Sequence, residues 1–408
     1  MTNYKTRIAT AIATGSVLLH ALAPMTLAAT EIRITGNGSD SNNTANVSQN
    51  SSLNVVQNNT ANVNNNVTVN ATTGSNNAND NTGGDVEIET GDASTDVTVK
   101  NALNSNAADV QNCGACAGDT KVVISGNGSD SDNDVKLNQG HSTNVFQYNN
   151  ADIDNDVDVD AETGDNDAND NTGGDVKIKT GDADTTVKIM TAANANSAVI
   201  GGGDEAGEVS AYIVGNGSDS DNDVNLGFYS SLVLTQDNDA DVDNDVDVDA
   251  ETGDNDANDN TGGDVIIDTG DADADVTVDN MVNFNAADAG CGCVFDVLAK
   301  IDGNGSDSDS EIYGNFGDAT SLFQDNGADL DNDVDVDGDT GDNEADDNTG
   351  AVEGVSDPAI TTGDADATVH TENSGNQNVI GSADLPDFEF DFNMNMWSLF
   401  MSWMSSHN

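Results

Sequence analysis

Aspartate alternates with valine or isoleucine in "ADIDNDVDVDAETGDNDANDNTGGD", residues 151–175, so a side-chain oxygen recurs at nearly every second position. Alternate residues of a β-strand point to one face, so these carboxylates should line a single surface. Closely spaced hard oxygen ligands suit calcium, which accepts about six to eight of them in flexible geometry. We predict that calcium binds the oxygens of this segment and its later copies, at Asp154, Asp156, Asp158, Asp160, Asp165, Asp167, Asp243, Asp245, Asp247, Asp249, Asp254, Asp256, Asp333, Asp335, Asp337 and Glu344.

The chain has 408 residues, of which 75 are acidic and 10 basic, giving a formal net charge of -65. Such a charge repels phosphate, so we expect cations, and neither nucleic acid nor an anionic membrane surface, as partners. Carboxylates on neighbouring coils about 4.8 Å apart repel by roughly 0.9 kcal/mol per pair even in water. Bound cations should therefore be needed for stability. The alternative is a halophilic acidic face that holds sodium or potassium diffusely; the excess of aspartate over glutamate favours calcium, because turns use the shorter acid.

One segment, "DVDVDGDTGDNE" at Asp333–Glu344, matches the calcium loop of an EF-hand. Valine alternates with aspartate there, which is a strand pattern, and no amphipathic helix flanks it. We therefore interpret it as the calcium-ligand segment of the repeat and reject a helix-loop-helix.

The sequence "GNGSDS" recurs at Gly36, Gly126, Gly215 and Gly303, a period of about 89 residues. Asn-Gly followed by Ser and Asp is typical of a turn. The predicted boundaries are a signal peptide at 1–29, repeats at 30–121, 122–210, 211–298 and 299–384, and a C-terminal segment at 385–408.

These repeats of short strands predict an all-β protein, a β-solenoid elongated along four repeats of about 89 residues. Thr-Gly-Asp corners begin at Thr163 and Thr180, so we expect several coils of about 17 to 22 residues in each repeat. The predicted inward residues would form a thin core: Val157, Val159, Val176, Ile178, Val187 and Ile189. The alternatives are a string of β-sandwich domains and a disordered acidic tether; the period-two alternation argues against disorder.

The segments "TGGDVKIKTGDAD" and "GNGSDSDNDV" resemble a group of largely uncharacterised secreted repeat proteins of candidate-phyla bacteria, rich in "NTGG…TGDA" and "GNG.DS" motifs. The resemblance covers most of the chain after residue 29 and implies an exported surface protein, built as a β-solenoid. It supplies no catalytic residues. The chain is less similar to RTX calcium-binding coils, because their Gly-Gly-x-Gly-x-Asp spacing is absent.

The first 29 residues contain two basic residues, an apolar run and small residues, the pattern of a secretory signal. In an oxidising compartment, two local disulfides are expected within the cysteine pairs, with a zinc site or free thiols as alternatives. The cysteines are Cys113, Cys116, Cys291 and Cys293. We expect His141, His370 and His407 to be solvated surface residues, and we predict no enzymatic activity, because none of them lies in a nucleophile motif. No apolar run predicts a transmembrane span.

Aromatic residues and methionines gather after Pro386, in "DFEFDFNMNMWSLFMSWMSSHN". This segment should either cap the last coil or pair with a neighbouring chain. The residues predicted to mediate self-association are Phe388, Phe390, Phe392, Trp397 and Trp403. The sequence as a whole predicts a secreted, calcium-stabilised structural protein of the cell surface or extracellular matrix, a rod or filament subunit. The alternative is an adhesin or ligand-binding module on a repeat stalk.

Overall fold

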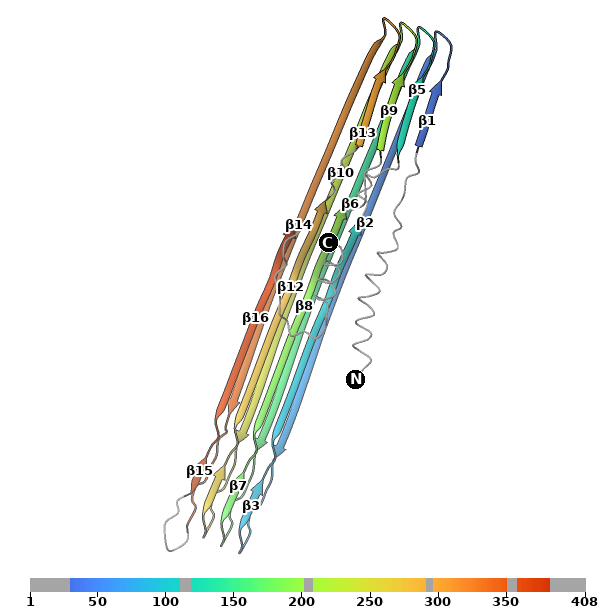
Figure 1. Ribbon diagram of the computed structural model, residues 1–408. Coiled ribbons are helices and arrows are strands. Elements are labelled where there is room, and N and C mark those ends of the chain that lie inside the picture. Colours follow the sequence, from blue (N-terminus) through green and yellow to red (C-terminus); the bar gives the residue numbers. More distant parts are fainter. Residues whose placement is uncertain (1–29, 111–118, 202–207, 291–295, 351–357, 382–408) are drawn as a thin grey trace.

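The computed structural model describes residues 30–110, 119–201, 208–290, 296–350 and 358–381, and every regular element in these ranges is a β-strand (Figure 1). Each repeat contributes one short strand, one very long strand, a second short strand and a strand of intermediate length. We call these four successive sets coils 1 to 4. Coils 1 and 2 are β1 (Thr30–Thr35), β2 (Asn42–Gly74), β3 (Val86–Glu89) and β4 (Ala93–Val110), then β5 (Thr120–Ser125), β6 (Asp132–Gly164), β7 (Val176–Lys179) and β8 (Ala183–Gly201). Coils 3 and 4 are β9 (Glu208–Val214), β10 (Asp221–Gly253), β11 (Val265–Asp268) and β12 (Ala272–Gly290), then β13 (Asp296–Asp302), β14 (Asp309–Asp339), β15 (Ala359–Thr361) and β16 (Ala365–Ile380).

Each strand pairs in parallel with the equivalent strand of the next coil, which gives four sheets of four strands. Their orders are β1-β5-β9-β13, β2-β6-β10-β14, β3-β7-β11-β15 and β4-β8-β12-β16. Equivalent residues are partners: Ile153 lies between Val63 and Val242. The prediction of an all-β solenoid of four repeats is thus confirmed.

The predicted coil length of about 17 to 22 residues is wrong, because one coil is a whole repeat. The two Thr-Gly-Asp corners of a repeat face each other at the end of the same coil, where Thr163 Oγ1 donates to the Gly181 carbonyl at 3.0 Å. The strand before this corner, β6, is 33 residues long. At about 3.3 Å per residue it extends for roughly 110 Å.

The long strands form one layer, which we call the long sheet (β2, β6, β10 and β14). The sheets of β4 and β1 follow each other lengthwise along the opposite layer, and the molecule is longest along its strands (Figure 1). The predicted elongation along the stack of repeats is therefore also wrong. In the described residues the stack is four strands wide.

The core between the layers alternates apolar clusters with columns of amide side chains. All six predicted inward residues are buried, and Val157, Val159, Val187 and Ile189 belong to one cluster. Elsewhere identical amides stack in register: Asn65 Nδ2 donates to Asn155 Oδ1 at 2.7 Å, and Asn155 Nδ2 to Asn244 Oδ1 at 2.6 Å. An amide both donates and accepts, so each amide of a column forms hydrogen bonds with the amides of the adjacent coils. The long strand can therefore continue through a polar interior.

Glycine is required at the corner that ends each of the first three long strands. Gly74, Gly164 and Gly253 have positive φ angles of 126°, 121° and 150°, which residues with a side chain rarely adopt. A Cβ atom on Gly164 would lie 1.8 Å from the Gly253 carbonyl oxygen. Close stacking of the coils therefore explains the recurrence of Thr-Gly-Asp.

Candidate functional site

The outward face of the long sheet carries aspartates at the same five positions of coils 2, 3 and 4. Their neighbours in sequence point inward and, apart from Ala328, are buried or half-buried, whereas nearly all the aspartates are exposed. Pairing in register places equivalent aspartates side by side on adjacent strands of the long sheet, and we call each strand's position in such a column a rung. We call these five sets the acid columns: Asp152 with Asp241 and Asp329; Asp154 with Asp243 and Asp331; Asp156 with Asp245 and Asp333; Asp158 with Asp247 and Asp335; Asp160 with Asp249 and Asp337.

Most of the predicted calcium ligands lie in these columns, so the structure brings together residues about 89 positions apart in the sequence. Asp331 and the column of Asp152, Asp241 and Asp329 were not among the predicted ligands. Their alternation with buried residues is the same and could have identified them.

The remaining predicted ligands lie in the turn after the long strand. Asp165 and Asp254 follow the corner glycine, both with a φ angle of 51°. Asp167 forms a parallel bridge with Asp256, and Asp256 with Glu344, so these three also stack across coils. Asp333, Asp335 and Asp337 of the EF-hand-like segment lie in strand β14, which agrees with rejecting a helix-loop-helix.

Burial and neighbouring carboxylates raise the proton affinity of three aspartates on the coil 3 strand of the acid columns, Asp243, Asp247 and Asp249. The pKa of Asp243 is raised by burial and then by the stacked carboxylates Asp331 and Asp154. The pKa of Asp247 is raised in the same way, first by burial and then by the stacked carboxylates Asp335 and Asp158. Repulsion between stacked carboxylates favours a bound proton, and it favours a bound cation in the same way, because either one reduces the negative charge of the column.

Coil 1 replaces every acid of these columns with a neutral residue. Strand β2 contains no aspartate or glutamate. Asn62, Asn64 and Asn66 donate to the carboxylates of Asp152, Asp154 and Asp156 at 2.7, 2.8 and 2.8 Å. The rung at the coil 1 edge thus supplies hydrogen-bond donors to the acids of coil 2.

The spacing of the acid columns fits calcium. Adjacent strands lie about 4.8 Å apart, so an ion midway between stacked carboxylates would be about 2.4 Å from each, within the usual calcium–oxygen range. Ion pairs in the described part of the chain include Arg33–Glu31, Lys136–Asp134 and Lys300–Asp302. None of them occupies an acid column.

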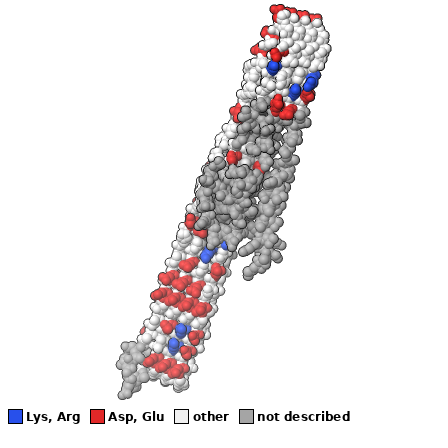
Figure 2. Space-filling view, in the orientation of Figure 1, with Lys and Arg blue, Asp and Glu red and all other residues white. Residues whose placement is uncertain are grey.

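Carboxylates also stack outside the long sheet. On the opposite layer Asp184, Asp273 and Asp366 occupy one column, and the pKa values of Asp184 and Asp273 are raised by burial and then by neighbouring acids. Figure 2 shows acidic side chains in repeated rows over the lower part of the face that it draws, with few basic ones among them.

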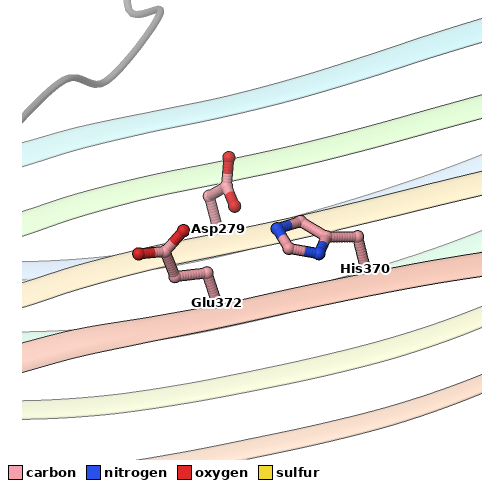
Figure 3. Close-up of side chains that lie close together, drawn as sticks. All are labelled: Asp279, His370 and Glu372. Carbon is pink, nitrogen blue, oxygen red and sulfur yellow. The ribbon is translucent and has the colours of Figure 1, made fainter.

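A second group of potential metal ligands was not predicted. Asp279 on β12 and His370 and Glu372 on β16 bring one ligand atom each within 4.8 Å of one another (Figure 3). The pKa of Asp279 is raised by burial and by Glu372, and lowered to a smaller extent by His370. One imidazole and two carboxylates could hold a zinc or manganese ion. Sequence spacing did not indicate this group, because coils 3 and 4 pair with an offset of 93 residues there and about 88 in the long sheet.

The prediction that the histidines are solvated is wrong for His141. His141 lies on β6 and its side chain is buried. Ser51 Oγ lies 3.3 Å from its Nδ1 atom, and burial lowers the pKa of the imidazole. His370 is exposed, as predicted.

Several predicted residues lie outside the described ranges. These are the signal peptide, His407, the four cysteines Cys113, Cys116, Cys291 and Cys293, and the self-association residues Phe388, Phe390, Phe392, Trp397 and Trp403. Within the described ranges no helix is long and apolar enough to span a membrane. No protein-family model, curated protein or solved structure matches this chain.

Proposed function

We propose that this protein is a secreted, non-enzymatic structural protein of a cell surface or extracellular matrix, and that calcium stabilises its solenoid. It would serve as a rod or filament subunit. The observation that supports this proposal is the in-register stacking of carboxylates in the acid columns.

Calcium is favoured over diffuse counterions because the carboxylates occupy fixed positions. The buried amide columns hold neighbouring coils in register, so the aspartates cannot separate by sliding one strand past the next. An ion that binds two or more carboxylates at once adds stability only to the folded chain, because the unfolded chain has no such array.

Secretion and the absence of catalysis rest on the sequence. Residues 1–29 have the pattern of a secretory signal. The carboxylates repeat regularly over an extended surface, whereas a general acid and base are a single pair held in distinct environments.

Calcium binding at constant sodium chloride, measured by equilibrium dialysis, tests this proposal. The variant Asp245→Asn, Asp247→Asn, Asp249→Asn removes three charges from the middle rung of the acid columns and should bind clearly fewer calcium ions than the wild type. Because Asn or Thr occupies the matching places in coil 1, the variant should keep its strand content in circular dichroism.

A matched control removes three charges from exposed aspartates that have no acid at the equivalent position of the adjacent coils. Asp275 pairs with Thr186 and Thr368, Asp239 with Asn150 and Gly327, and Asp318 with Ser230. The control variant Asp239→Asn, Asp275→Asn, Asp318→Asn should bind nearly as much calcium as the wild type. Equal losses in both variants would contradict specific sites and support the diffuse, halophilic alternative.

A further inference from the structure

All four sheets end on the same two coils. Strands β1, β2, β3 and β4 of coil 1 form one edge, and β13, β14, β15 and β16 of coil 4 form the other. Among the described residues, no strand pairs with the outer side of either edge. Such edges expose backbone donors and acceptors that can pair with another chain.

The core is open at coil 4. Ile312 and Phe316 point inward but are 49% and 58% exposed, whereas their coil 3 equivalents Val224 and Phe228 are 1% and 0% exposed. The Phe316 ring stacks on Phe228, with centroids 5.4 Å apart, and its other side has no described ring partner. Covering this end would remove apolar surface from water, which is favourable.

The charges of the two edges are complementary. Coil 4 ends the acid columns on aspartates, including Asp329 and Asp331, whereas coil 1 ends them on Asn62, Asn64 and other neutral residues. Coil 1 of a second copy laid on coil 4 would place neutral rungs against acids, the same pairing that coils 1 and 2 already make. Two coil 4 edges would place acid against acid.

The buried asparagine columns have a direction. In the column that begins at Asn65, each Nδ2 donates toward coil 4 and the last bond reaches Asn332 Oδ1 at 2.7 Å. The column of Asn59, Asn149, Asn238 and Asn326 runs the same way. Coil 1 therefore presents asparagine acceptors, and coil 4 presents asparagine donors.

The glutamine column runs in the opposite direction. Gln324 Nε2 donates to Gln236 Oε1, Gln236 to Gln147 and Gln147 to Gln57, each at 2.7 Å. Gln324 Oε1 in coil 4 is buried without a hydrogen-bond partner. At the other end, Gln57 Nε2 donates to the Ala107 carbonyl, whereas Gln147 Nε2 donates both to a glutamine and to a backbone carbonyl. The unused acceptor of coil 4 thus matches a donor of coil 1.

We propose that copies of this chain stack end to end, with coil 4 of one copy against coil 1 of the next, so that the sheets and amide columns continue through the joint. This inference deepens the proposed function and rests on it, since it identifies the partner of a filament subunit as a second copy of the chain. The strands would lie perpendicular to the filament axis, whereas in the single molecule they run along its longest dimension.

Exchanging the charges of the two edges tests the inference. The variant Asn62→Asp, Asn64→Asp, Asn66→Asp, Asn70→Asp puts acids on coil 1, and should raise the protein concentration needed for assembly by at least about tenfold, because acids would then face acids across the joint. It should still fold, because coils 2 to 4 carry aspartate at these positions. Assembly is measured in calcium by analytical ultracentrifugation, and folding by circular dichroism.

A second variant restores the complementarity. Adding Asp329→Asn, Asp331→Asn, Asp333→Asn and Asp337→Asn to the first variant returns the net charge to that of the wild type and places neutral rungs on coil 4. Assembly should return to within about threefold of the wild type. Assembly of the first variant at the wild-type concentration, or a failure of the second variant to restore assembly, would overturn the inference.

Other outcomes separate the inference from the proposed function. Filaments of the wild type should give a meridional diffraction spacing of about 4.8 Å. A wild-type chain that calcium stabilises but that stays monomeric would overturn end-to-end stacking alone, and would favour the alternative in which the C-terminal segment 385–408 is a cap. Charge-sensitive assembly of a chain that calcium does not stabilise would support stacking and overturn the calcium proposal.

Discussion

Asn155 and Asp156 are neighbours in β6 but point to opposite faces of the long sheet. Asn155 is buried and bonds to Asn65, Asn101 and Asn244. Asp156 is exposed and stacks between Asn66 and Asp245. The register is the same on both faces, but an amide both donates and accepts, whereas an ionised carboxylate can only accept. The inner face therefore fixes the register, and that register places like charges together on the outer face.

Placing an acid on the inner face should have the largest effect. Asn155→Asp would put a charge inside the amide column and remove the donor to Asn244 Oδ1, and we expect a loss of about 3 kcal/mol or more in the free energy of unfolding. Chemical denaturation followed by circular dichroism measures it.

The matched variant replaces the acid at the adjacent position, on the outer face, with an amide. Asp156→Asn removes one charge from an acid column, and Asn66 already occupies that column in coil 1. Without calcium, this change should leave the free energy of unfolding unchanged or raise it by up to about 1 kcal/mol. Equal losses for both variants would contradict the contrast between the two faces.

A smaller effect is expected from pH when divalent cations are removed by a chelator. Burial, followed by neighbouring carboxylates on the same and adjacent strands, raises the pKa values of Asp243, Asp247 and Asp249 above the ordinary value of 3.8. The folded chain therefore binds protons more tightly than the unfolded chain, and its stability falls as the pH rises from 3.8 through the raised pKa values. The Tm at pH 4, just above the ordinary value, should exceed that at pH 7, and saturating calcium should reduce the difference. A Tm that rises with pH in the chelator would count against repulsion within the columns.

The fold class and the apolar core could be predicted from the sequence, because small and β-branched residues at every second position mark a strand. Val157, Val159 and Ile189 were identified in this way, and all are buried. The coil length could not, because buried amides such as Gln147 and Asn149 look like the polar end of a strand. They become core residues only when identical amides stack above and below them.

The acid columns could be predicted in part. Alternation with valine indicated which aspartates share a face, but pairing across coils depends on a register that the structure supplies. The Asp279, His370 and Glu372 group was missed because it combines two strands whose offset departs from the repeat period. His141 was misjudged because a single histidine among polar residues carries no signal of burial.

The measurement that tests calcium stabilisation most directly is thermal unfolding of the wild type in calcium chloride and in sodium chloride at equal ionic strength. Calcium at about 100 times its dissociation constant should add roughly 2.7 kcal/mol for each independent site, so calcium should raise the Tm far more than sodium does. An equal rise in sodium chloride would contradict specific calcium sites, and would show that screening alone relieves the repulsion between the stacked aspartates.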